Sequence, residues 1–236
     1  MRVSEKFDFK QFTVYHDRAT MKVGTDAVIL GAWVQLNNAK RILDIGTGSG
    51  VIALMLAQRS SSQTKIDAIE ISAADCKQAN ENVDRSPWPA KIQIHQTSLQ
   101  QFESDAFDLI VSNPPYFINS FKPPHAKRTN ARHTETLTHL ELLAHSKRLL
   151  KPNGRLNVIL PITEGSQLKT LAENIGWFNT RLCVFRSRSN KPPERLLLEF
   201  QFEKKPLLEE RLNLYEKDLE WSANYRDLTK EFYLSC

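Results

Sequence analysis

Short apolar runs alternate with longer amphipathic segments along the chain from residue 41 onward. The apolar runs have the length of buried strands, and the segments between them repeat apolar positions at the three- and four-residue spacing of helices. The pattern predicts strands over 41–46, 65–71, 91–95, 107–112, 155–161, 181–186 and 195–202, and helices over 50–59, 72–83, 137–150 and 164–175.

Strands that alternate with helices in this way pack as a mostly parallel sheet with helices on both faces. The last two predicted strands are separated only by the turn-forming stretch SRSNKPP, which favours an antiparallel pair. The predicted fold class is therefore α/β, with a Rossmann-like, mostly parallel seven-stranded sheet and one antiparallel edge strand.

We expect residues 1–236 to form a single domain with three parts. Residues 41–205 form the core that carries the alternating pattern. Residues 1–40 contain the apolar stretch MKVGTDAVILGAW, which predicts an ordered cap on the core. Residues 206–236 form a C-terminal extension, in which apolar residues near the end recur at helical spacing.

Composition narrows the class of protein only a little. The chain is 41% hydrophobic and 25% charged, as in ordinary globular proteins, and its net charge of +5 is a mild bias toward anionic partners. No apolar run approaches the roughly 20 residues that span a membrane, and the first ten residues lack the apolar centre of a signal peptide. Cys76, Cys183 and Cys236 show no metal-ligand or redox spacing, which predicts reduced thiols in a cytoplasmic protein without a bound metal.

The first core strand runs into a glycine-rich turn, ILDIGTGSG, before the first core helix. Gly46, Gly48 and Gly50 allow a tight turn and let a ligand approach the backbone, and the helix that follows offers free N–H groups to an anion. The spacing also fits the G-x-G-x-x-A pattern of nicotinamide sites. Asp44 argues against that interpretation, because a carboxylate there would repel a pyrophosphate but would suit the ammonium group of an amino-acid cofactor.

Glu70 ends the second core strand and follows the glycine turn at a distance at which a carboxylate can accept both hydroxyls of a ribose. With D-x-G-x-G-x-G at 44–50, the chain resembles the class I S-adenosylmethionine-dependent methyltransferases over roughly residues 20–205. The resemblance implies that S-adenosyl-L-methionine is the cofactor. It implies that the residues lining it are Asp44, Gly46, Gly48, Gly50 and Glu70.

One cofactor position departs from the common pattern of that family. After the strand at 91–95, the family often has an Asp that accepts a hydrogen bond from the adenine amino group, whereas this chain has Ser98 in the stretch HQTSLQQF. The Ser98 hydroxyl can still accept one hydrogen bond. Such a contact is weaker than one to a carboxylate, and Ser98 is the residue we expect near the adenine.

The strand at 107–112 is followed by Asn-Pro-Pro-Tyr at 113–116, at a strand end where α/β enzymes bind ligands. A planar amino group is a poor nucleophile until acceptors on its N–H bonds aim its lone pair and favour the pyramidal transition state. Asn113 offers a side-chain carbonyl, Pro114 a backbone carbonyl, and Tyr116 a ring on which a base can stack. The motif resembles that of methyltransferases acting on adenine N6, guanine N2 and glutamine amides.

Two long stretches, 109–134 and 174–193, contain no acidic residue. The first runs out of the Asn-Pro-Pro-Tyr motif, and both fall near the predicted catalytic edge. Such stretches can be solvated loops, but two of them near one catalytic face suggest a phosphate-binding surface. Their cations are Lys122, Lys127, Arg128 and Arg132 in the first stretch and Arg181, Arg186, Arg188 and Lys191 in the second.

The N-terminal stretch FKQFTVYHDRATMKVGTDAVILGAW is the most specific part of a wider resemblance. With DIGTGSG, NPPYF and the closing LTKEFYL, it is similar to the family of bacterial tRNA (adenine-N6) methyltransferases that modify valine tRNA next to its anticodon. The resemblance implies adenosine 37 of the anticodon loop as the target, and in this interpretation Lys22, Val23, Gly24 and Thr25 help to close the cofactor site. From the acid-free stretch after the Asn-Pro-Pro-Tyr motif, we expect Lys127, Arg128 and Arg132 to bind the RNA. We expect a monomer.

Three other functions remain open at this stage. A protein glutamine methyltransferase shares the motif. Such enzymes have a separate helical domain ahead of the cofactor turn, and the first 40 residues leave little room for one. A guanine-N2 methyltransferase of ribosomal RNA is a closer rival, although such enzymes more often have Phe in place of Tyr116. An RNA-binding module that keeps the fold without turnover is the alternative that is not an enzyme.

Overall fold

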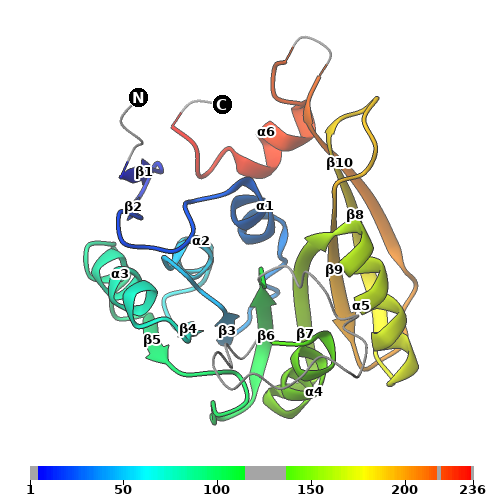
Figure 1. The fold of residues 1–236 in the computed structure, drawn as a ribbon, viewed down its shortest axis with the longest axis horizontal. Coiled ribbons are helices and arrows are strands. Elements are labelled where there is room, and N and C mark those ends of the chain that lie inside the picture. The colour runs from blue at the N-terminus through cyan, green and yellow to red at the C-terminus, as the bar shows by residue number, and fades with distance from the viewer. Residues whose placement is uncertain (1–4, 115–136, 217–218, 235–236) are drawn as a thin grey trace, which may run out of the picture.

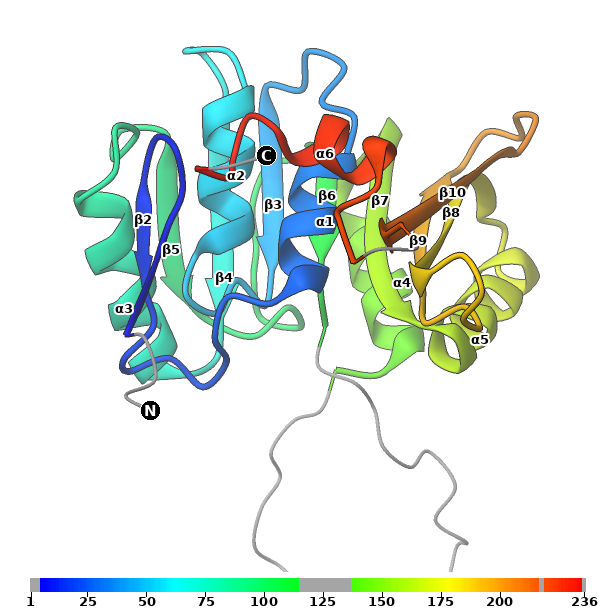
Figure 2. The same cartoon turned by 90° about the horizontal axis from the view of Figure 1, so that it is seen from above.

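The computed structural model describes residues 5–114, 137–216 and 219–234. Its main feature is a large twisted sheet between two layers of helices (Figures 1 and 2). The described helices are α1 Thr25–Trp33, α2 Val51–Arg59, α3 Ala73–Asp84, α4 His139–Leu149, α5 Ile162–Asn174 and α6 Ala223–Thr229. The described strands are β1 Lys6–Asp8, β2 Thr13–Tyr15, β3 Arg41–Ile45, β4 Lys65–Glu70, β5 Ile92–Gln96, β6 Phe107–Ser112, β7 Leu150–Pro161, β8 Phe178–Arg188, β9 Arg195–Gln201 and β10 Leu208–Tyr215.

The described part of the main sheet has the strand order β10-β8-β9-β7-β6-β3-β4-β5. All of these strands are parallel except β9, which runs antiparallel to both β7 and β8. The α/β class and the mostly parallel sheet are therefore confirmed. Two details differ from the expectation. The sheet has eight strands, because part of the C-terminal extension joins it as β10, and the antiparallel strand lies between β7 and β8 instead of at the edge.

Each face of the sheet covers its own hydrophobic core. Leu109 and Val111 of β6 face the core beneath α1, α2, α3 and α6, while Ile110 between them faces the core beneath α4 and α5. This two-residue alternation follows from the pleat of a strand that is buried on both faces. The two cores hold the carboxyl ends of the parallel strands in fixed register, which is what positions the site.

Thr138 and Glu141 have the spacing of a capping box in the sequence, and helix α4 begins directly after Thr138. The Thr138 hydroxyl accepts from the backbone N–H of Glu141, and the Glu141 carboxylate accepts from the backbone N–H of Thr138. This capping box satisfies two N–H groups that a helix start leaves open. Strand β7 then starts at Leu150, earlier than the predicted residue 155, because Leu150 pairs with Phe107 ahead of a bulge.

The two ends of the chain are joined by aromatic contacts. The ring of Phe9 meets Phe232 edge to face and stacks on Tyr233, and the N–H of Lys10 donates to the carbonyl of Phe232 at 2.8 Å. The β1–β2 hairpin and the C-terminal segment thus lie side by side on the α1 face of the sheet (Figures 1 and 2). The helical spacing near the C-terminus is confirmed by α6, whose Tyr225 is 1% exposed.

Candidate active site

The register of the sheet brings four sequence-predicted residues to one edge. Asp44 of β3 pairs with Ala68 of β4 and with Val111 of β6, and Glu70 of β4 pairs with Gln96 of β5. Since these strands are parallel, their carboxyl ends lie at the same edge. Across the carboxyl ends of adjacent strands, the four residues follow one another in this order: Ser98 after β5, Glu70 at the end of β4, Asp44 near the end of β3 and Asn113 after β6.

The turn between β3 and α2 has the backbone that its glycines allow. Gly46, Gly48 and Gly50 have φ of +71°, +55° and +86°, a region that side chains with a Cβ rarely adopt. A Cβ added at Gly46 or Gly48 would meet nothing within 4 Å. The backbone of the turn therefore faces open space, which is the room that a ligand needs to approach it.

Asp44 is fully buried at the floor of this turn. Its Oδ2 accepts from the hydroxyl of Thr47 at 2.6 Å, while its Oδ1 has no hydrogen-bond partner among the described residues. Burial raises the pKa of Asp44 to about 7, against the opposing effect of the hydrogen bonds from Thr47 and the backbone of Ala53, and the nearby carboxylate of Glu70 adds to the rise. A buried carboxylate with an open oxygen can receive a cationic group of a ligand.

Glu70 has a different environment on the neighbouring strand β4, two residues beyond Ala68, which pairs with Asp44. Its Oε2 accepts from the N–H of Gly48 at 3.1 Å, and its Oε1 accepts from the N–H groups of Ile71 at 2.8 Å and Ser72 at 3.0 Å. The carboxylate thus bridges the glycine turn and the start of α3. It is only partly buried, so it can also meet the hydroxyl groups of a bound ribose.

Ser98 lies just beyond β5 and is 7% exposed. Its carbonyl accepts from the N–H groups of Gln101 and Phe102, which fixes the turn. Its hydroxyl has no hydrogen-bond partner among the described residues. A buried hydroxyl without a partner is costly, and a ligand group at this edge would satisfy it.

Asn113 and Pro114 follow directly from β6. Ser112, the last residue of that strand, donates from its hydroxyl to the carbonyl of Ile45 at 3.0 Å, which ties the end of β6 to the end of β3. Asn113 is partly buried and Pro114 is buried. Asn113 therefore follows the Ile45–Ser112 pair and lies next to the start of the glycine turn. The predicted residues Tyr116, Lys127, Arg128 and Arg132 lie outside the described residues.

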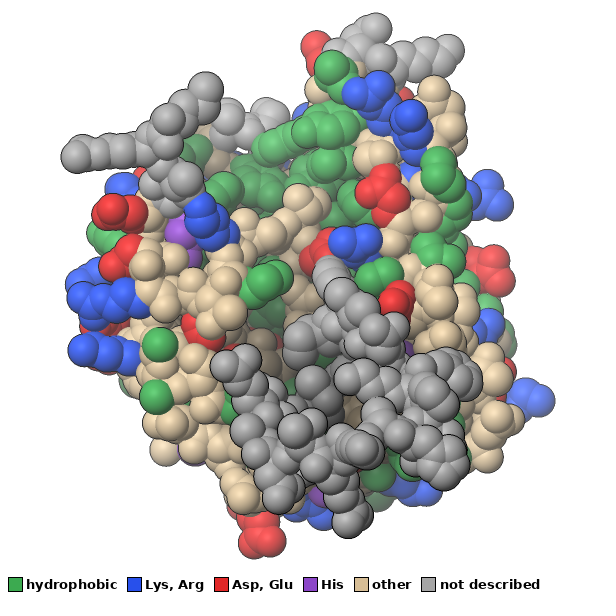
Figure 3. Space-filling model, in the orientation of Figure 1, with side chains coloured by type: hydrophobic (Ala, Val, Ile, Leu, Met, Phe, Trp, Pro, Cys, Tyr) green, Lys and Arg blue, Asp and Glu red, His purple; other side chains and the backbone are tan. Residues whose placement is uncertain are grey.

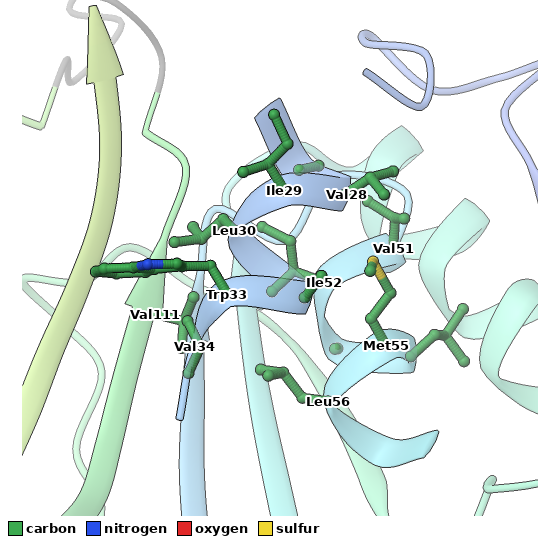
Figure 4. Close-up of a cluster of buried hydrophobic side chains, with 14 of the residues drawn as sticks. Val28, Ile29, Leu30, Trp33, Val34, Val51, Ile52, Met55, Leu56 and Val111 are labelled. Atoms are coloured by element: carbon green, nitrogen blue, oxygen red, sulfur yellow. The ribbon is translucent and has the colours of Figure 1, made fainter. Parts of the chain in front are cut away.

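Helix α1 starts at the same end of the molecule as α2. Figure 4 shows Val28 beside Val51 at one end of the pair and Val34 near Leu56 at the other, so the two helices run in roughly the same direction. Thr25, the first residue of α1, is exposed at this end. Thr25 therefore lies at the end of the molecule where α2 and the glycine turn begin, and its role in the cap stays a prediction.

Sequence reasoning missed a set of buried polar residues on α3 that hold the N-terminal segment. Asn82 accepts from the N–H of Tyr15 at 2.9 Å and donates to the carbonyls of Tyr15 at 2.8 Å and of Ser49 in the glycine turn at 2.9 Å. Asp75 accepts from the N–H and the hydroxyl of Thr20, both at 2.7 Å. The signal was available, because polar residues 75, 78 and 82 share one helix face, but only the structure shows that this face is buried.

Three further observations bear on the class of site. No group of three or more potential metal ligands occurs among residues 5–114, 137–216 and 219–234. Within the same described ranges, no helix is long and apolar enough to cross a membrane. Cys76 and Cys183 are free and buried, and burial raises the pKa of the Cys76 thiol to about 11, so it is protonated at neutral pH.

Solved structures share this fold. A predicted O-methyltransferase from Agrobacterium tumefaciens superposes with a TM-score of 0.70, covering 88% of this chain and 96% of its own, at 16% identity. The ribosomal protein L11 methylase from Lactobacillus delbrueckii subsp. bulgaricus covers 81% of this chain and 84% of its own, with a TM-score of 0.58 and 17% identity. Identities this low show the fold alone.

Sequence comparison is more specific. Residues 19–180 match the family described as methyltransferase small domain. The tRNA1(Val) (adenine(37)-N6)-methyltransferase of Tolumonas auensis is 45% identical over 228 residues, which cover 97% of this chain and 96% of the relative. The protein of the same name from Histophilus somni is 40% identical and is covered over its whole length, as is this chain. The chain therefore belongs to the methyltransferase small domain family and, within it, to the family of tRNA1(Val) (adenine(37)-N6)-methyltransferases.

Proposed function

We propose that this protein transfers a methyl group from S-adenosyl-L-methionine to the N6 amino group of adenosine 37 in the anticodon loop of valine tRNA. The observation that carries the proposal is the arrangement of Asp44, Glu70 and Asn113 at the ends of three adjacent strands. The names of the full-length relatives support the choice of tRNA and of adenine N6. The proposal includes a cytoplasmic location and a monomeric enzyme.

The residues of the cofactor half fit S-adenosyl-L-methionine. The open Oδ1 of Asp44 receives the ammonium group, Glu70 receives the ribose hydroxyls, and the hydroxyl of Ser98 meets the adenine. Gly46 and Gly48 leave room for the ligand against the turn, and Gly50 gives the turn its left-handed backbone. Thr25 on the cap completes the cofactor half. When bound, the cofactor supplies an electrophilic methyl group on a sulfonium.

Asn113 and Pro114 prepare the nucleophile. The side-chain carbonyl of Asn113 and the backbone carbonyl of Pro114 accept the two N–H bonds of adenine N6, so the lone pair of the nitrogen is aimed at the methyl group. The ring of Tyr116 stacks on the base. No general base is needed before transfer, because the methylated nitrogen can release its proton to water afterwards. The site accordingly needs hydrogen-bond acceptors more than it needs charge.

The target base must leave the anticodon loop to reach this site. A loop base that is already unpaired can be splayed out for a few kcal/mol or less. Lys127, Arg128 and Arg132 contact the RNA phosphates near the base. Replacing all three with Ala is expected to weaken tRNA binding and to flatten its salt dependence, and an unchanged salt slope in a filter-binding titration would remove them from the proposal.

The proposal is tested on unmodified valine tRNA with labelled S-adenosyl-L-methionine, followed by digestion to nucleosides and mass spectrometry. Wild type is expected to form N6-methyladenosine at position 37. Asn113→Ala is expected to lower the rate roughly 100-fold with little change in cofactor affinity, and Asn113→Asp, which keeps an acceptor oxygen, is expected to lose less. Asn80→Ala, at an exposed position on α3, serves as the matched control.

The other outcomes are informative. Methylguanosine in place of methyladenosine would keep the chemistry and change the substrate. Methylation of protein glutamine without any methylated nucleoside would overturn the choice of RNA. Equal loss of rate and cofactor affinity in Asn113→Ala would overturn the role of Asn113 in aiming the amino group.

A further inference from the structure

The last residues of β8 and the turn that leads to β9, residues 186–194 and called here the β8–β9 turn, project beyond the catalytic edge. Ser112 at the end of β6 is level with Val158 of β7, Leu198 of β9 and Leu182 of β8 through successive strand pairs. Since β8 runs parallel to β6, the residues after Leu182 extend past that edge. At about 3.3 Å per residue, Arg188 lies roughly 20 Å further along the strand, and the three strand spacings between β6 and β8 add about 14 Å sideways.

The cations of this turn differ from those inside the sheet. Arg181 on the same strand is buried and pairs with Glu210 at 2.9 Å, and buried Arg155 pairs with Glu199 at 3.1 Å. In contrast, no ion pair joins the cations of the turn to any described acidic residue. These cations are Arg186 and Arg188, which are partly exposed, and Lys191, which is exposed.

The acidic residues nearest to the turn do not form ion pairs with these cations. Glu194 accepts from the backbone N–H of Ser187 across the turn at 3.0 Å. Arg188 pairs with Tyr215 of β10 across the sheet, and Glu216 comes directly after Tyr215. Glu216 forms no ion pair with the three cations in the part of the chain that the structure describes. Figure 3 shows Lys and Arg side chains gathered at the upper right, where Figure 1 draws this turn beside β10. The turn therefore presents positive charge on the same side of the molecule as the site.

The turn is also firmly held. The N–H of Glu194 donates to the carbonyl of Phe185 at 2.9 Å, and the N–H of Lys191 donates to the carbonyl of Arg188 at 3.0 Å. At its base, Arg195 pairs with Asp26 of α1 at 2.8 Å, next to Thr25. A fixed group of cations loses less conformational entropy on binding than a loose one.

We propose that the β8–β9 turn, through Arg186, Arg188 and Lys191, is a second docking surface for the phosphate backbone of the tRNA, separate from the contacts at the target base. This inference rests on the proposed function and specifies where the substrate lies. A base held at Asn113 leaves the adjoining RNA to extend along the catalytic edge, and the turn meets its phosphates there. Phosphate contacts of this kind position the nucleic acid without reading its sequence.

The test compares two double variants from the same part of the sheet. Arg188→Ala with Lys191→Ala removes two charges from the turn, and Lys204→Ala with Lys205→Ala removes two charges after β9, at the opposite end of these strands. The dissociation constant of unmodified valine tRNA is measured with S-adenosylhomocysteine present, over a range of salt concentrations. Methylation by each variant is then measured at saturating tRNA.

The turn variant is expected to bind tRNA on the order of tenfold more weakly at low salt and to lower the magnitude of the salt slope by about 1 to 2. Its rate at saturating tRNA and its cofactor affinity are expected to match wild type, and the control variant is expected to keep wild-type binding. An unchanged dissociation constant and salt slope would overturn the docking surface. So would a loss of cofactor affinity equal to the loss of tRNA affinity, which would indicate a structural role.

Failure of this inference is distinguishable from failure of the proposed function. If wild type methylates adenosine 37 while the turn variant binds tRNA normally, only the docking surface is wrong. If wild type forms no methylated nucleoside, the proposed function is wrong, and the docking surface that rests on it is withdrawn.

Discussion

Asp44 and Glu70 end neighbouring strands and face the same turn, yet the protein treats the two carboxylates in opposite ways. Asp44 is fully buried, has hydrogen bonds from the hydroxyl of Thr47 and the backbone of Ala53, keeps its Oδ1 without a partner among the described residues, and has a pKa that burial raises to about 7. Glu70 is partly exposed and receives three backbone N–H groups, from Gly48, Ile71 and Ser72. The charge of Asp44 is thus held at a cost in stability, whereas the charge of Glu70 is stabilised by backbone N–H groups.

The difference suggests a division of roles. An under-bonded, buried carboxylate gains most from a cationic ligand, because the ligand restores the solvation that burial removed. A carboxylate already bonded to the turn and to the start of α3 shapes the site before any ligand arrives. We therefore expect Asp44 to contribute mainly to binding energy and Glu70 to contribute to both binding and folding.

The largest expected effect comes from Asp44→Asn. Loss of the charge opposite an ammonium group is expected to weaken cofactor binding about 100-fold or more, since breaking a buried pair costs roughly 3–5 kcal/mol. The ligand-free protein is expected to become more stable at pH 8 by about 1–3 kcal/mol, because an uncompensated buried charge is removed. Calorimetric titration and thermal unfolding measure the two effects. A less stable ligand-free variant would contradict the view that Asp44 is held at a cost.

Glu70→Gln is the matched change at the other carboxylate. It is expected to weaken cofactor binding about 10- to 30-fold, because one acceptor oxygen becomes an amide donor. Stability is expected to fall by about 1–3 kcal/mol, since a backbone N–H of the turn or of α3 loses its partner. The opposite signs of the stability changes in the two variants are the sharpest form of the comparison. Equal signs would break it.

The pH dependence of binding separates the two carboxylates next. Because the pKa of Asp44 is raised to about 7, the group is mostly protonated at pH 6 and must lose that proton to meet an ammonium group. Cofactor affinity is therefore expected to rise roughly fivefold from pH 6 to pH 7, below the pKa of the ligand's own amino group. Glu70→Gln should keep this dependence and Asp44→Asn should lose it, as measured with S-adenosylhomocysteine.

The same pKa fixes the sign of a stability change. The folded-state pKa of Asp44 lies above its ordinary value of 3.8, so the folded state holds the proton more tightly. This group therefore stabilises the ligand-free protein less as pH rises from about 4 to 7. Unfolding by denaturant across this range should show the decline in wild type, and Asp44→Asn should reduce it.

The smallest expected effect concerns Ser98. Its buried hydroxyl has no partner among the described residues, so Ser98→Ala is expected to change cofactor affinity by about threefold or less. Ser98→Asp supplies a charged acceptor and is expected to tighten binding modestly, because charge-assisted hydrogen bonds are stronger. If Ser98→Asp binds the cofactor more weakly while its fold is intact, the predicted contact between residue 98 and the adenine is wrong.

Much of this site could be predicted because its residues depend on local geometry. Gly46, Gly48 and Gly50 all have positive φ, and a strand that ends in a glycine turn fixes where Asp44 and Glu70 lie. The polar face of α3 could not be predicted, because Asn82 is buried only through its contacts with Tyr15 and Ser49, which are distant in sequence. The roles of all these residues in binding and catalysis stay predictions.

The sequence by itself determined the alternation of strands and helices, the capping box at Thr138 and the glycine turn, because each depends on neighbours within a few residues. Only the tertiary structure decided that Leu208–Tyr215 adds an eighth strand, that β9 lies inside the sheet, and that the basic β8–β9 turn stands at the catalytic edge. The reason is physical. Backbone hydrogen bonds can form between strands in many different strand orders. The order adopted is the one in which the helices and the chain ends cover the apolar faces of the sheet.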